Sequence, residues 1–146
     1  MTAKNYLEQI SLKNARINNL IKDKENMLQL LYSLSCASSD ERVQSSPNLD
    51  RIGTIYAKVD AKEREITERI DELVDFRSQV TSEINALDDR RYIIVLHKRY
   101  VQMESFREVA NDLGYDYRHV TRLNKQALQC FDCKYQEKLK NFKKMS

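Results

Sequence analysis

The first third of the chain repeats apolar residues at intervals that alternate between three and four positions. Such spacing is typical of a helix that packs along a coiled-coil seam. The seam positions are Leu7, Ile10, Asn14, Ile17, Ile21, Lys24, Leu28 and Leu31. Asn14 and Lys24 are polar, and a polar seam residue lowers stability but fixes the register of the pairing. The pattern predicts a helix over about residues 3–35 with a defined partner helix.

A stricter heptad follows the only proline, Pro47. Apolar residues stand seven positions apart at Val59, Ile66, Leu73, Val80 and Leu87, and Ile55, Ile70 and Ile84 supply the other half of the seam. This pattern predicts a helix over residues 51–87 with Asp50 as its N-cap. The serine-rich stretch before it predicts a loop at about residues 36–50. The two helices either fold into an antiparallel hairpin or pair with a second chain to form a homodimer, and the pattern leaves both arrangements open.

A different pattern begins at residue 88, where the apolar spacing fits three short helices. The first is expected over residues 88–101 and the third over Tyr117 to about Phe131. The second is expected between Ser105 and Leu113, because Ser105 and Glu108 have the spacing of a capping box.

Gly114 directly follows the second of these helices. Glycine adopts the left-handed conformation that closes a helix at little cost, and Asp116 can then cap the third helix. Helix, short glycine turn and helix form the helix–turn–helix layout. We therefore predict an all-α fold, with a long antiparallel coiled-coil hairpin over 1–87 and a small helix–turn–helix domain over 88–146.

The third helix is expected to have two faces. Its buried stripe would consist of Val120, Leu123, Ala127 and Leu128. Its other face would present Tyr117, Arg118, Thr121, Arg122 and Lys125, with His119 near the edge. Arg and Lys pair with guanine edges or phosphates, and Thr and Tyr contact phosphate oxygens or thymine methyls. These six residues are the predicted DNA-binding residues, and the alternative is an ordinary solvated face.

The charge distribution supports a polyanionic partner for the C-terminal part. The net charge is only +3, but residues 1–87 carry 12 Lys/Arg and 14 Asp/Glu, whereas residues 88–146 carry 13 and 8. The lysine-rich tail over 136–146 either follows a phosphate backbone or is a solvated end. A positive cluster at one end of a chain favours nucleic acid as a partner.

Composition excludes several classes of protein. No apolar run approaches the roughly 20 residues of a membrane span, and the N-terminus lacks the apolar core of a secretory signal. Three cysteines do not make a disulfide framework. We therefore expect a reduced, cytoplasmic protein with no membrane contact.

No catalytic or metal site is evident. Cys130 and Cys133 form a C-x-x-C motif, but a structural zinc ion needs four ligands, and Cys36, His97 and His119 lack suitable spacing. Glycine-rich phosphate loops, nucleophile elbows and HExxH motifs are absent. The sequence predicts neither an enzyme nor a cofactor.

The segment RYVQMESFREVANDLGYDYRHVTRLNKQAL resembles the fourth conserved region of bacterial sigma factors. The matching positions are Tyr100, Glu108, Val109, Ala110, Leu113, Gly114, Val120, Ala127 and Leu128. The whole layout is similar to small phage and prophage proteins of the ArpU and RinA type, which are late transcription regulators. This resemblance implies double-stranded DNA as a ligand and bacterial RNA polymerase as a further partner.

Two other readings remain. A terminase small subunit also combines a DNA-binding helical unit with an oligomerising one, although its order of parts differs from the order here. A coiled-coil adaptor that binds RNA polymerase, without binding DNA, would share the same helical pattern.

Overall fold

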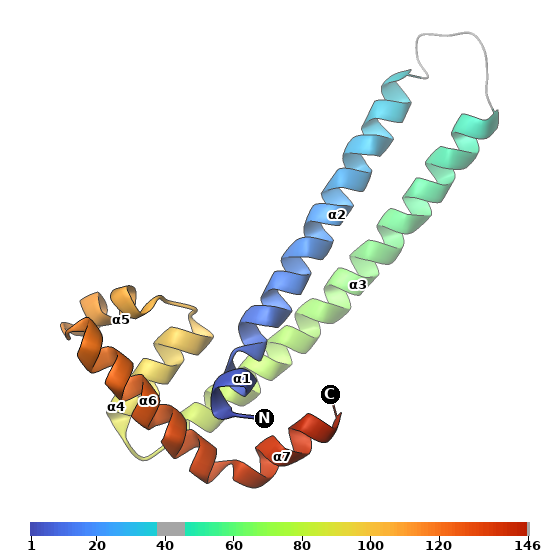
Figure 1. Cartoon of the computed structure of the whole chain (residues 1–146). Coiled ribbons are helices and arrows are strands. Elements are labelled where there is room, and N and C mark those ends of the chain that lie inside the picture. Colours follow the sequence, from blue (N-terminus) through green and yellow to red (C-terminus); the bar gives the residue numbers. More distant parts are fainter. Residues whose placement is uncertain (38–45, 146) are drawn as a thin grey trace. The chain divides into compact units, whose positions relative to one another are not determined.

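The computed structural model describes the backbone of residues 1–37 and 46–145, and the side chains of 1–36 and 49–142. Over these ranges the chain is helical and contains no strand, so the predicted all-α class is confirmed. The elements, shown in Figure 1, are α1 (Ala3–Leu7), α2 (Gln9–Ala37), α3 (Ser46–Asn85), α4 (Arg90–Leu96), the π-helix η1 (His97–Val101), α5 (Phe106–Leu113), α6 (Tyr117–Lys134) and α7 (Gln136–Met145). None of the described helices is long and apolar enough to cross a membrane.

The helix ends around the expected loop differ from the prediction. The helix α2 continues to Ala37 and α3 already begins at Ser46, so residues 38–45 of the expected loop at 36–50 lie outside the described residues. Pro47 falls in the first turn of α3, where a helix needs no donor from its backbone nitrogen. Asp50 consequently lies inside α3 and is not its N-cap.

The chain divides into two compact units at positions that the sequence did not indicate. Unit 1 comprises residues 1–12 and 73–146, and unit 2 comprises residues 13–72. The sequence placed a single boundary at residue 87. The boundary differs because residues 1–12 and the last part of α3 share a core with the C-terminal helices, which a heptad pattern alone does not reveal.

The main core of unit 1 is built around Tyr6. Its ring contacts Phe76 and Phe142 edge to face, with centroid distances of 5.4 and 5.0 Å, and lies 6.1 Å from the ring of Phe131. The Tyr6 hydroxyl donates to Glu83 Oε1 at 3.3 Å. The other buried members are Ala3, Leu7, Ile10, Val80, Ile84, Leu87, Leu96, Tyr100, Val101, Ala127 and Leu139. This core holds α6 in place from the side opposite to its polar face.

In unit 2, residues 13–37 of α2 and 46–72 of α3 lie side by side and run in opposite directions (Figure 1). Lys24 and Glu63 join the two helices through an ion pair of 3.3 Å. Leu28 and Ile70, which were expected in the seam, are instead 40% and 41% exposed. Among the side chains of this unit that the structure describes, the buried apolar ones are Ile17, Leu31, Val59 and Ile66.

Candidate nucleic-acid interface

The helix α5 begins with the capping box that the sequence predicted. The Ser105 hydroxyl accepts from the backbone N–H of Glu108 at 3.2 Å, and the Glu108 carboxylate accepts from the backbone N–H of Ser105 at 2.7 Å. Two backbone donors at the start of the helix are thereby satisfied by side chains within four residues. The start of α5 is therefore fixed by local sequence.

The turn after α5 closes at Gly114, whose φ of 67° and ψ of 30° lie in the left-handed region, as predicted. The backbone N–H of Tyr115 donates to the carbonyl of Ala110 at 3.0 Å, which ties the turn to the end of α5. The helix α6 begins at Tyr117, only three positions after the glycine. Gly114 therefore ends α5 in the left-handed conformation, and only two residues separate it from the start of α6.

Asp116 occupies the N-cap position of α6 but does not cap it with its side chain. Its backbone is extended, with φ −71° and ψ 149°, and its carbonyl accepts from the backbone N–H of Val120 at 3.1 Å. The Asp116 carboxylate forms no capping hydrogen bond. The expected position of the N-cap is thus correct, whereas the expected side-chain cap is not formed.

A small apolar cluster packs α5 against α6. Val109 and Val120 are fully buried and Ala110 is 6% exposed, with Phe106 and Leu113 packed against them. Farther along α6, Leu123 and Ala127 are buried as predicted, while Leu128 is half-buried. The buried stripe also includes Asn124 and Phe131, which extend the contact of α6 with the rest of unit 1.

The opposite face of α6 carries the predicted binding residues. Arg118, Arg122 and Lys125 are exposed and Tyr117 is 52% exposed, whereas His119 and Thr121 are half-buried. The three cations form no ion pair with any residue whose side chain the structure describes. All three charges are available to an external anion.

The side chain of Thr121 forms a hydrogen bond within its own helix. Its hydroxyl donates to the carbonyl of Arg118 at 2.9 Å. The hydroxyl oxygen can still accept a hydrogen bond, but its proton is occupied. Thr121 therefore suits a methyl contact better than donation to a phosphate.

Aromatic rings surround the start of α6. Tyr115 contacts His119 edge to face at a centroid distance of 4.8 Å, and Phe106 contacts Tyr117 in the same way at 6.2 Å. The guanidinium carbon of Arg99 lies 4.6 Å from the centroid of Phe106. Sequence reasoning missed Tyr115, Phe106 and Arg99 as parts of this region. A tyrosine in the tight turn after Gly114, where Gly, Pro, Asn, Asp and Ser are usual, was the signal that could have found Tyr115.

A charged cluster fixes the loop that precedes α5. Lys98 Nζ lies 3.1 Å from the carboxylate of Asp112 and 3.6 Å from that of Glu104. The hydrogen bond from Lys98 lowers the pKa of Asp112, and the same contact raises the pKa of Lys98. Arg99 Nη1 donates to the carbonyl of Glu104 at 2.9 Å. The loop also contains Met103, which has a positive φ of 58°.

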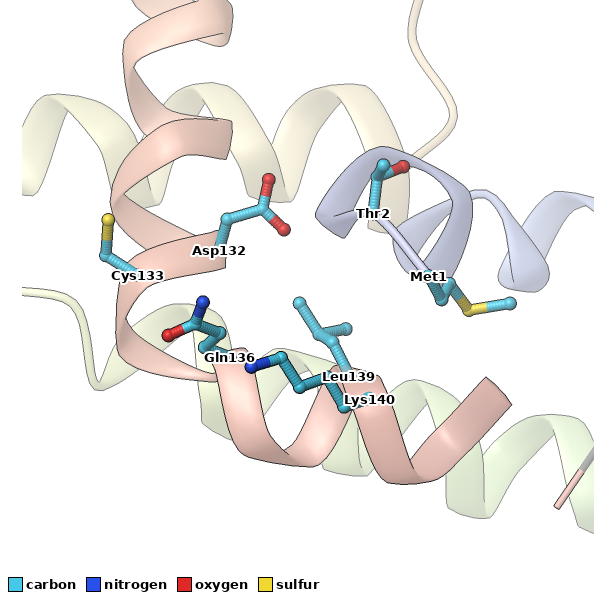
Figure 2. Close-up of a pocket in the computed structure, with 7 residues that line it drawn as sticks. All are labelled: Met1, Thr2, Asp132, Cys133, Gln136, Leu139 and Lys140. Atoms are coloured by element: carbon cyan, nitrogen blue, oxygen red, sulfur yellow. The ribbon is translucent and has the colours of Figure 1, made fainter. Parts of the chain in front are cut away.

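An open hollow of about 470 Å³ lies in unit 1, between the first residues of the chain, the end of α6 and α7 (Figure 2). The side chain of Asp132 points from α6 toward Thr2, and its Oδ1 accepts from the backbone N–H of Ala3 at 2.7 Å. The remaining lining residues are Met1, Cys133, Gln136, Leu139 and Lys140. The Asp132 carboxylate in this hollow therefore caps the N-terminus of α1.

The C-x-x-C motif does not gather metal ligands. Cys130 is half-buried and Cys133 is exposed on α6. Over the residues that the structure describes, no group of three or more His, Cys, Asp or Glu side chains is placed to hold a metal ion.

No protein-family model, curated protein or solved structure matches this chain. Any assignment of function therefore depends on the geometry of α5, the glycine turn and α6.

Proposed function

We propose that the chain is a sequence-specific DNA-binding transcription regulator, encoded by a phage or prophage, that acts through a sigma-like helix–turn–helix. The observation that carries this proposal is the polar face of α6. Three unpaired cations project from the first half of a helix whose other face is buried, directly after a left-handed glycine turn. A helix of this kind fits the major groove of B-DNA.

The six predicted residues take different roles in this proposal. Arg118 and Arg122 lie on the first two turns of α6, where a recognition helix makes its base contacts. A guanidinium forms two hydrogen bonds with the O6 and N7 atoms of guanine. Lys125 lies farther along and contacts phosphate, which positions the helix without reading sequence. The sugar–phosphate backbone of the DNA and the thymine methyls are contacted by Tyr117, His119 and Thr121.

Unit 2 has a separate role in this proposal. We propose that it is a coiled-coil hairpin, which either dimerises or contacts RNA polymerase. Large apolar side chains are exposed on both of its helices, including Tyr32 at 74%, Leu49 at 72% and Tyr56 at 55%. A protein contact made through these side chains would remove apolar surface from water.

Selection of DNA sequences by the purified full-length chain, followed by affinity measurements, tests the proposal. The chain should enrich a defined site, and the double variant R118A/R122A should lose specific binding while keeping its circular dichroism spectrum and melting temperature. The matched control is R51A/R64A, which removes two exposed arginines from unit 2. Equal affinity of the wild type and R118A/R122A for the selected site would refute the proposal.

The same preparation separates the two other readings. A ring-sized oligomer in light scattering would favour a terminase small subunit over a regulator, for which we expect a monomer or dimer. An absence of salt-sensitive DNA affinity would favour an adaptor that binds protein through unit 2.

A further inference from the structure

Tyr115 and Tyr117 are the exposed aromatic residues beside the cations of α6. They are 39% and 52% exposed. Neither hydroxyl is hydrogen-bonded to a residue that the structure describes. Tyr117 immediately precedes Arg118 and Tyr115 lies three positions before it, so phenol rings and positive charge occur together at the start of the helix.

Both rings are held in place by other rings. The Tyr115 ring meets His119 at an interplanar angle of 88°, and Tyr117 meets Phe106 at 87°. Phe106 is in turn covered by the guanidinium of Arg99, which donates to the carbonyl of Glu104. Because these contacts already restrict the side chains, a ligand that binds them immobilises little additional freedom. The rings are therefore pre-organised as well as exposed.

An intact duplex offers little to such rings. In paired DNA the faces of the bases are covered by their neighbours, and a protein in the groove reaches only base edges and thymine methyls. An unpaired base exposes its whole face, and aromatic side chains beside cationic ones are the usual way in which proteins bind it. The pair of tyrosines thus suits an unpaired base better than a paired one.

We propose that Tyr115 and Tyr117 are each a stacking site for an unpaired DNA base, so that the chain binds locally unpaired DNA more tightly than the same DNA fully paired. This inference rests on the proposed function, because the cations of α6 supply the attraction to the backbone. Stacking on one aromatic side chain corresponds to a gain in affinity of about 5- to 100-fold.

Fluorescence anisotropy with the full-length chain tests the inference on three labelled probes. The first is a duplex, the second is the same duplex with a short mismatched bubble, and the third carries abasic sites in place of the bubble bases. The wild type should bind the bubble about 5- to 100-fold more tightly than the duplex. The abasic probe should bind like the duplex, since it is flexible but offers no base to stack.

Two pairs of variants separate stacking from hydrogen bonding. The ratio of bubble affinity to duplex affinity should fall in Y115A and in Y117A. Duplex affinity itself should stay unchanged in Y115A and decrease in Y117A, because Tyr117 also contacts the duplex. Y115F and Y117F should keep the ratio. Unchanged circular dichroism shows that the alanine variants are folded. A preference that survives in both alanine variants, or is lost in both phenylalanine variants, would overturn the stacking site.

The failure of the inference is distinguishable from the failure of the proposed function. Salt-sensitive binding to the duplex with no preference for the bubble overturns only the stacking site. Absence of salt-sensitive binding to all three probes overturns both.

Discussion

The backbone N–H of Ala3 donates to Oδ1 of Asp132 at 2.7 Å, although the two residues are 129 positions apart in the sequence. The first turn of α1 is thus capped by a side chain from α6, in addition to the local cap from Thr2. This hydrogen bond joins the beginning of the chain to the helix that carries the predicted binding face. The stability of unit 1 is therefore linked to residues at both ends of the chain.

Removing this cap should destabilise unit 1. We expect D132A to lower the free energy of unfolding by about 1 kcal/mol, because the backbone N–H of Ala3 loses its acceptor. D132N keeps a carbonyl oxygen at the same place and should lie closer to the wild type. Urea denaturation followed by circular dichroism measures both values. Equal stability of D132A and the wild type would show that the hydrogen bond contributes nothing.

The two glycines should respond in opposite ways to alanine. Gly114 has a φ of +67°, whereas Gly53 lies inside α3, and an added Cβ meets no atom within 4 Å at either position. The backbone conformation therefore determines whether alanine stabilises or destabilises the chain at each position. G114A should cost about 1 kcal/mol because alanine disfavours the left-handed region, and G53A should gain up to about 1 kcal/mol from helix propensity. Thermal denaturation of the two variants would contradict this reasoning if both shifted the melting temperature in the same direction.

Local signals in the sequence predicted the local structure around the candidate site. Ser105 with Glu108, and Gly114 directly after Leu113, determine helix ends through contacts within a few residues, so their roles can be read from spacing. The cations of α6 could be placed on one face for the same reason. Their DNA contacts stay a prediction.

Long-range features could not be predicted in this way. Tyr6 packs against Phe76, Phe131 and Phe142, which come from three different helices, and no periodicity connects these positions. The exposure of Leu28 likewise depends on how α2 is rotated against α3. The neighbouring Met27 is half-buried, so the inward face of α2 includes Met27 more than Leu28. The unit boundaries differ from the expected one for the same reason.

The free energy of unfolding should decrease as the pH is lowered through the range where His97 titrates. Partial burial, with smaller effects from Arg77 and Lys98, lowers the pKa of His97 below its ordinary value near 6.5. The unfolded chain therefore binds a proton at higher pH than the folded chain does. Stability is complete above about pH 6.5 and decreases as the pH falls toward the lowered pKa.

Replacing His97 tests this pH dependence. H97Q should lose the part of the slope that the histidine causes, as measured by urea denaturation across this pH range. An NMR titration of the wild type gives the pKa directly. A His97 pKa at or above 6.5, or an unchanged slope in H97Q, would contradict the assignment.

Lys24 should limit the stability of unit 2. It is a seam residue that forms an ion pair with Glu63, and the two side chains are 29% and 53% accessible to solvent. Such partly exposed pairs contribute at most about 1 kcal/mol to the free energy of unfolding. K24L should raise the melting temperature because it adds apolar surface at the seam, whereas E63Q should change it little. A lower melting temperature in K24L and in E63Q would show that the ion pair is required for the pairing.

The salt dependence of DNA binding tests the central claim most directly. The affinity of the full-length chain for its selected duplex should fall linearly with salt on logarithmic axes. K125A should reduce the magnitude of the slope by about 0.9, because Lys125 neutralises a phosphate, whereas R118A and R122A should lower the affinity for the selected site at every salt concentration. K58A, which removes an exposed cation from unit 2, should leave the slope unchanged. A slope near zero, or equal slopes for the wild type and K125A, would contradict the account.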